Sequence, residues 1–223
     1  PATLSPRVRI DYAVYKGQID ALLAEQRYRE YEKPLNADSS FWGEINEAAR
    51  GSFRTEKDYR DYLALMRSIP RHYDQQIANM RVGIRDGFTL PRENIGGVSQ
   101  VIGGFRYESP EAIGLYAPFA SFPATVPETE RARLREAGRA AIANSVIPAF
   151  DEFRTFFETE YAPRARNTIA AQRLPNGRAY YADLVRYYTT LPDATPQQIH
   201  QIGLREVARI RAAMEVEMRA SGF

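Results

Sequence analysis

Residues 195–222 carry a complete signature of a long α-helix. Thr195 can accept a hydrogen bond from the Gln198 backbone N–H while the Gln198 side chain reaches back to the Thr195 N–H, which makes a capping box. Pro196 follows at the first helical position, where its missing N–H costs nothing, and Gly222 is a typical stop. Apolar residues recur on one face at three- and four-residue steps: Ile199, Val207, Ile210, Met214 and Met218. These residues predict a packed helix and specify no reaction.

The same combination of cap and apolar stripe recurs along the chain. Ser5–Pro6 opens a helix that we expect to end near Tyr31, before Pro34. One face of that helix carries Val8, Tyr12, Tyr15, Ile19 and Leu22. Thr55–Asp58 and Thr125–Glu128 fit further capping boxes. The sequence therefore predicts an all-α fold, an irregular bundle of about seven long helices with proline kinks and no substantial sheet.

Prolines and one tight turn set the expected helix boundaries. Pro70 interrupts a stripe and is predicted to end one helix and start the next, and Pro148 to kink or divide a later one. Asn176–Gly177 predicts a tight turn before a helix over 178–189. Trp42, the only tryptophan, is expected to anchor the irregular segment 34–53 to the core.

Composition excludes several classes of function. The 223 residues include no cysteine, which excludes disulfides, thiolate zinc sites and a cysteine nucleophile. Basic and acidic residues nearly balance, with a net charge of +2, and they alternate along the chain, so we expect no nucleic-acid partner. No apolar run reaches the roughly 20 residues that span a bilayer, so no membrane span is expected. The length allows one large or two modest domains, and we expect a single helical domain over residues 1–223.

The sequence offers no catalytic motif. The two histidines, His72 and His200, lie far apart and neither belongs to an HExxH helix. No GxSxG elbow, SxxK pair or phosphate-binding loop occurs. Neighbouring carboxylates such as Asp151 and Glu152 point in different directions on a helix and indicate solvated charges. We therefore predict no catalytic residue, no metal ligand and no cofactor within these 223 residues.

Tyrosine and arginine gather on the segment that follows Asn176–Gly177. Tyr180, Tyr181, Tyr187 and Tyr188 lie there, with Arg178 and Arg186 beside them. One interpretation is a core edge with the phenol hydroxyls at the rim. The other is a cleft wall whose phenols and guanidinium bind the carbonyl or carboxylate of a peptide-like substrate. For that case the candidate substrate-binding residues are Arg186, Tyr187, Tyr188 and, less directly, His200.

Three stretches carry a family resemblance. They are FRTEKDYRDYLALMRSIPRHYDQQIANMRVGIRDGFTLPR, GRAYYADLVRYYTT and TPQQIHQIGLREVARI. In order and spacing they resemble the bacterial family called domain of unknown function 885, over about residues 28–222. The resemblance implies a long, mostly helical protein, often exported or lipid-anchored, that is similar to helical zinc metallopeptidases. In that family the proposed zinc motif, a His-Glu followed by Gly-His-His, lies beyond the matching region, so no zinc ligand transfers to a position here.

Two functions remain open at this stage. The resemblance implies the N-terminal helical portion of an exported zinc metallopeptidase-like protein, which forms part of the substrate-cleft wall and lacks the zinc motif. Zinc would then belong to the full-length protein, the location would be the periplasm or cell envelope, and the ligand a peptide. The alternative is a non-catalytic helical module that binds a partner. A portion of a larger protein is expected to expose Val207, Ile210 and Met214, or to bury them only against its missing C-terminal catalytic half or a second copy; a self-contained chain would bury them internally.

Overall fold

The fold is almost entirely helical. The computed structural model describes residues 4–35 and 40–222. Within them, helices of ten or more residues are α1, α3, α4, α6, α7, α8 and α9, and the only extended pairings are the isolated bridges Leu35–Ser40 and Pro91–Arg166. The predicted all-α fold with about seven long helices and no substantial sheet is therefore confirmed. The chain divides into two compact units, Arg29–Ile169 and the combination of Pro1–Tyr28 with Ala170–Phe223. The single domain expected over 1–223 stays a prediction.

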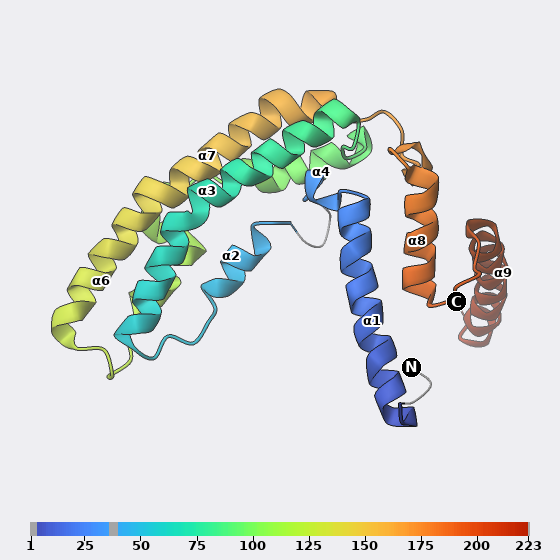
Figure 1. Ribbon diagram of the computed structural model, residues 1–223, viewed down its shortest axis with the longest axis horizontal. Helices are drawn as coiled ribbons and strands as arrows, with labels where there is room; N and C mark the ends of the chain where they lie inside the picture. The colour runs from blue at the N-terminus through green and yellow to red at the C-terminus, as the bar shows by residue number, and fades with distance from the viewer. Residues whose placement is uncertain (1–3, 36–39, 223) are drawn as a thin grey trace. The chain divides into compact units, whose positions relative to one another are not determined.

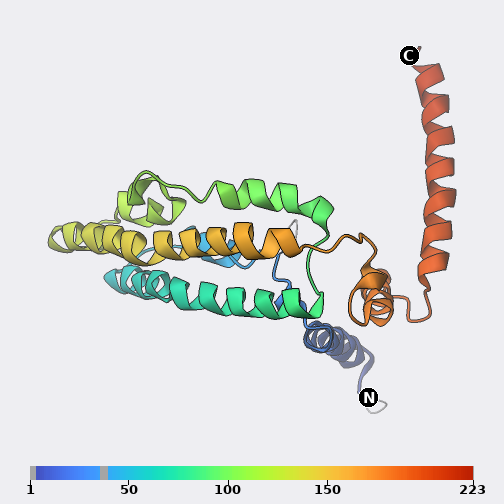
Figure 2. The same ribbon diagram turned by 90° about the horizontal axis from the view of Figure 1, so that it is seen from above.

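The unit Arg29–Ile169 holds the main core. Its helices are α2 (Gly43–Ala48), α3 (Glu56–Asp86), α4 (Arg92–Gly103), α5 (Ala117–Ala120), α6 (Glu128–Ala141) and α7 (Ile147–Phe156). α3 runs alongside α6 and α7 (Figure 1), and α7 lies between α3 and α4 in Figure 2. The largest fully buried side chains include six aromatic residues: Tyr59, Tyr73, Phe119, Phe153, Phe157 and Tyr161. Trp42 packs on this core edge-on to Phe105, with ring centroids 5.5 Å apart, and anchors its segment as predicted.

α3 corrects the prediction at Pro70. The helix begins with the predicted Thr55–Asp58 capping box and continues through Pro70 to Asp86, with Gly87 in the left-handed region as its C-cap. An interior proline costs a helix about 3 kcal/mol. Buried residues at helical spacing on both sides of Pro70, among them Met66 and Tyr73, hold the helix together. Tertiary packing therefore outweighs the local signal.

The continuous helical segment that contains α6 and α7 changes its hydrogen-bond pattern near Pro148. A π-helical segment, Ile142–Val146, joins α6 to α7, and another, Phe157–Tyr161, follows α7. The first π segment directly precedes Pro148, where the missing N–H interrupts the α-helical ladder. The segment from α6 to α7 stays helical, but its hydrogen-bond pattern changes from α to π and back, as the predicted division at Pro148 implies. The expected capping box at Thr125–Glu128 is wrong, because the Thr125 hydroxyl donates to the Arg54 carbonyl and α6 begins without a side-chain cap.

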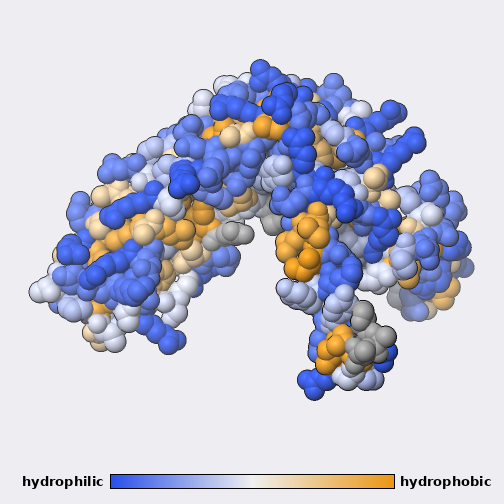
Figure 3. Space-filling view, in the orientation of Figure 1, coloured by the Kyte–Doolittle hydropathy of each residue, from blue (hydrophilic) through white to orange (hydrophobic). Residues whose placement is uncertain are grey.

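The other unit has three α-helices among its described residues and little core. They are α1 (Pro6–Arg27), α8 (Gly177–Thr189) and α9 (Pro196–Ala220). The predicted caps at Ser5 and Thr195 both form, but α1 ends at Arg27 rather than near Tyr31. α1 and α9 contain no buried residue, and Figure 3 shows apolar side chains gathered on α1. Only α8 buries residues in this unit's helices.

Candidate functional site at the α8–α9 corner

The start of α8 depends on a glycine. Asn176 adopts the left-handed region with φ 52°, and α8 begins at Gly177, which confirms the predicted turn and helix. A Cβ on Gly177 would lie 2.2 Å from the Ala171 carbonyl oxygen. No side chain fits there, so the backbone of α8 approaches the short 3₁₀-helix Ala171–Arg173 directly. This close backbone contact holds the start of α8 against the 3₁₀-helix, and Tyr180 and Val185 are buried on the inner face of α8.

Asp183 connects α8 to the end of α1. The Tyr28 hydroxyl donates to Asp183 Oδ2, Arg27 Nη1 lies 3.7 Å from the same oxygen, and Arg186 pairs with Oδ1. The Tyr28 and Tyr180 rings pack beside this cluster with centroids 5.1 Å apart. The Asp183 side chain is only 19% exposed, so its charge is held by these partners. Sequence reasoning missed Asp183; its three-residue spacing to Arg186 is the one local signal that indicates the pair.

The four predicted substrate-binding residues have different surroundings in the structure. Tyr187 and Tyr188 are 60% and 78% exposed at the end of α8, and their rings meet edge-on with centroids 5.1 Å apart. The Arg186 guanidinium is held by Asp183. His200 is exposed in the second turn of α9. Of the four residues, only Tyr187 and Tyr188 contact each other, and the rings of both are exposed to solvent.

The backbone leaves α8 in an unusual conformation. Thr190 has φ 58°, in the left-handed region that β-branched residues rarely adopt. The Thr189 hydroxyl holds this corner, since it donates to the Val185 carbonyl at 2.7 Å and accepts from the Leu191 N–H at 3.3 Å. Backbone strain of this kind gathers near binding sites, where the surrounding contacts maintain it.

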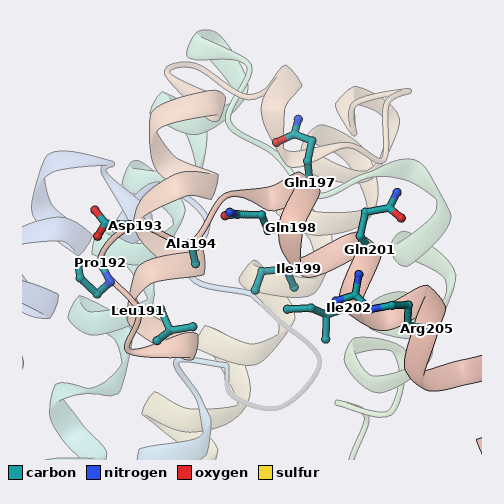
Figure 4. A pocket seen from close by; sticks show the side chains of 10 residues that line it. All are labelled: Leu191, Pro192, Asp193, Ala194, Gln197, Gln198, Ile199, Gln201, Ile202 and Arg205. Carbon is teal, nitrogen blue, oxygen red and sulfur yellow. The ribbon is translucent and has the colours of Figure 1, made fainter. Parts of the chain in front are cut away.

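An open groove follows directly after this corner. The connection from α8 supplies one side and the first turns of α9 the other, as Figure 4 shows. Its volume of about 590 Å³ is in the range of small-ligand sites. Its lining residues are Leu191, Pro192, Asp193, Ala194, Gln197, Gln198, Ile199, Gln201, Ile202 and Arg205. None of the four predicted residues lines it, because the sequence does not reveal how the connection after α8 and the first turns of α9 lie against each other.

The groove combines an apolar floor with charged groups that lack partners. Leu191, Ile199 and Ile202 provide the apolar surface. Among the described residues neither Asp193 nor Arg205 forms an ion pair, whereas Arg209 on the same helix pairs with Glu206. An unpaired guanidinium is a strong donor for a carboxylate. The groove can therefore hold an apolar group beside an anion.

The described residues do not form a metal site. Across residues 4–35 and 40–222, no three His, Cys, Asp or Glu side chains are grouped so as to hold a metal ion. His72 belongs to Arg29–Ile169 and packs against Phe41, with ring centroids 5.7 Å apart, whereas His200 belongs to the other unit. The described residues therefore offer no set of three ligands for the zinc that the resemblance implies for the full-length protein. In the same described ranges, no helix has the length and apolarity to cross a bilayer.

Comparison with known proteins gives the family. A family model described as "Bacterial protein of unknown function (DUF885)" matches residues 1–223. The chain belongs to this family. The resemblance of the three sequence stretches to DUF885 is thereby confirmed, and no curated protein matches the chain.

A solved structure shares the fold of this DUF885 chain. It is titled as "the putative lipoprotein from Colwellia psychrerythraea", with a TM-score of 0.75 and 22% identity. The match covers 83% of this chain and 32% of that chain, so this chain spans about a third of the length of the solved protein. At this identity the likeness concerns the fold alone.

Proposed function

We propose that this chain is the N-terminal helical portion of an exported metallopeptidase-like hydrolase, and that the α8–α9 corner borders its substrate cleft. The observation that carries the proposal is a groove directly after the helix that ends with the exposed phenols; Asp193 and Arg205 line it, and neither forms an ion pair among the described residues. Zinc and its ligands would belong to the part of the protein beyond this region. A location in the cell envelope is supported by the lipoprotein title of the solved relative.

The chemistry of the corner suits a peptide. Leu191, Ile199 and Ile202 contact an apolar side chain, and the Arg205 guanidinium donates hydrogen bonds to a neighbouring carboxylate. Phenol hydroxyls of Tyr187 and Tyr188 donate to a carbonyl oxygen, and the donation strengthens as negative charge grows on that oxygen. In this proposal the part of the corner is to bind and orient the substrate.

Arg186 and His200 take secondary parts in this proposal. Because Arg186 pairs with Asp183, it fixes the end of α8 on which Tyr187 and Tyr188 stand. His200 is exposed on α9 but lies outside the groove lining. Arg186 is thus a positioning residue, and His200 remains the least direct of the four candidates.

The test replaces the phenols in the longer protein. Tyr187→Phe and Tyr188→Phe remove only a hydroxyl from an exposed ring, so the melting temperature should hardly change. One preorganised donor contributes up to about 3 kcal/mol in a transition state, so peptide hydrolysis should fall between tenfold and roughly a hundredfold. Arg205→Gln should raise KM for peptides with an acidic residue and leave kcat nearly unchanged.

The matched control is Tyr181→Phe, which lies on the same helix and is also exposed. It should leave hydrolysis unchanged. Equal activity of all three tyrosine variants, or a loss that follows the melting temperature, would contradict the cleft assignment and leave the tyrosines as part of the architecture.

The second candidate is a non-catalytic partner-binding module. Val207, Ile210 and Met214, which are exposed on α9, would give such a module a binding face without any chemistry, although a portion of a larger protein is expected to expose them too. A longer protein that binds peptides or proteins but hydrolyses no peptide bond would favour this module over the hydrolase.

A further inference from the structure

Two helices of the DUF885 chain present apolar faces whose side chains are exposed. The α1 seam, with side chains between 38% and 65% exposed, consists of Val8, Tyr12, Tyr15, Ile19 and Leu22. The α9 stripe, between 46% and 57% exposed, consists of Val207, Ile210, Met214 and Met218. Within the described residues, neither helix contains a buried residue.

The spacing of the α1 seam indicates what kind of surface fits it. Its members follow one another at steps of four, three, four and three residues, which is the spacing of a coiled-coil heptad. By helical geometry, Arg9 and Lys16 lie along one edge of the seam, and Asp11 and Glu25 along the other. A partner helix with an apolar seam of its own, acidic beside Arg9 and basic beside Asp11, complements this face.

Both helices need another element packed on their apolar faces to be stable. Isolated helices are marginal in water, and most helix stability in proteins comes from packing an amphipathic face. α1 has 22 residues and α9 has 25, yet neither packs its apolar face in the described structure. The long helix α3, by contrast, buries residues along most of its length.

We propose that the α1 seam and the α9 stripe are covered by helices from the remainder of the same polypeptide. The solved relative supports this occupant, since the shared fold takes up only 32% of that chain. A second copy in parallel register would also bring Asp11 opposite Lys16, so the experiment must separate the two. The proposal rests on the longer polypeptide that the proposed function assumes, but it does not depend on peptidase activity.

The experiment compares the 223-residue chain with the longer protein by hydrogen exchange. Amides of α1 and α9 should exchange at least about tenfold more slowly in the longer protein, because covered helices open less often. Tyr15→Asp on the α1 seam and Met214→Asp on the α9 stripe should lower the melting temperature of the longer protein. In the 223-residue chain the same variants should leave it unchanged.

Matched controls lie on the same helices, away from the seam and the stripe. Val14→Asp and Val216→Asp replace side chains that are 59% and 60% exposed but stand off the seam and the stripe. They should have little effect in either protein. A larger effect of the controls than of Tyr15→Asp and Met214→Asp would overturn the assignment of the covered faces.

Three other results would overturn the proposal. They are equal exchange in both proteins, a gene that ends at residue 223, and a dimer of the 223-residue chain in sedimentation that Tyr15→Asp dissociates. Failure of the proposed function looks different: the helices would be protected and the seam variants destabilising, while peptide hydrolysis would be absent.

Discussion

Three buried tyrosines differ in what their hydroxyls contact. The Tyr161 hydroxyl accepts from the Leu90 N–H at 2.9 Å, and the Tyr62 hydroxyl donates to the Leu115 carbonyl at 2.9 Å. The Tyr73 hydroxyl is buried and has no hydrogen-bond partner among the described residues. Burial raises the pKa of all three, and that of Tyr161 to about 12. The same residue type therefore contributes differently to stability at each position.

At the residue scale we predict opposite outcomes for two hydroxyl deletions. Tyr161→Phe leaves the Leu90 N–H unsatisfied in the core and should cost about 1–3 kcal/mol of unfolding free energy. Tyr73→Phe removes a buried hydroxyl without a partner and should be neutral or slightly stabilising. Urea unfolding at neutral pH measures both. A Tyr73→Phe loss as large as that of Tyr161→Phe would contradict the assignment.

The stabilising effect of the Tyr161 hydroxyl should also depend on pH. Its pKa is raised from 10.0 to about 12 in the folded protein, so the folded state favours the neutral phenol. The contribution is complete below pH 10 and is lost as the pH rises from 10 towards 12, by up to about 3 kcal/mol. The stability difference between the natural chain and Tyr161→Phe should therefore shrink between pH 7.5 and pH 11. Tyr73→Phe should likewise gain stability relative to the natural chain over this range, because burial raises the pKa of the Tyr73 hydroxyl too. A constant difference for Tyr161→Phe would refute this.

At the element scale, α3 is placed by a close backbone approach as well as by its apolar stripe. A Cβ on Gly83 would lie 2.5 Å from the Glu32 carbonyl oxygen and 2.9 Å from that of Phe88. Both neighbours are backbone atoms, so no side-chain rotation relieves the contact. Gly83 thus lets the end of α3 meet the short 3₁₀-helix Glu30–Glu32, where Glu32 and Asp86 both pair with Arg29.

We predict that Gly83→Ala destabilises the protein by about 1–3 kcal/mol or more, because the backbone must shift to admit the methyl group. The control is Gly97→Ala in α4, where a Cβ would meet nothing within 4 Å. There alanine should stabilise the helix by up to about 1 kcal/mol, since it has the higher helix propensity. Thermal melting followed by circular dichroism compares the two. Similar melting temperatures for both variants would show that the Gly83 contact does not constrain the fold.

At the scale of the whole molecule, the two units differ in how much they bury. The largest fully buried side chains all belong to Arg29–Ile169, while α1 and α9 of the other unit bury none. Local stability follows buried apolar contacts, so the free energy of opening should differ strongly between the units.

Limited trypsin digestion of the 223-residue chain should show this difference. Early cuts are expected in α9, where Arg205, Arg209 and Arg211 are exposed, and in α1. A fragment that spans most of Arg29–Ile169 should persist. Cleavage inside α3 or α7 as early as inside α9 would contradict the expected order, and mass spectrometry of the fragments distinguishes the two results.

The sequence by itself determined the helical class and most helix starts. Capping at Ser5, Thr55 and Thr195, and the turn at Asn176–Gly177, depends on residues within one helical turn, so local chemistry is sufficient. The same reasoning failed where distant contacts compete with local ones. Packing on both sides of Pro70 keeps α3 continuous, and the Arg54 carbonyl takes the Thr125 hydroxyl away from α6.

Only the tertiary structure decided the candidate site. Local spacing indicates Asp183 with Arg186, but the pairing of Asp183 with Tyr28 joins residues 155 positions apart. The groove forms between the connection that follows α8 and the first turns of α9. Among the described residues Arg205, which lines it, forms no ion pair, whereas Arg209 pairs with Glu206 on its own helix. Amphipathic spacing predicts that another element packs on the α9 stripe. The spacing does not show whether that element belongs to these 223 residues. The structure shows Val207, Ile210 and Met214 exposed, because no described element packs against that face.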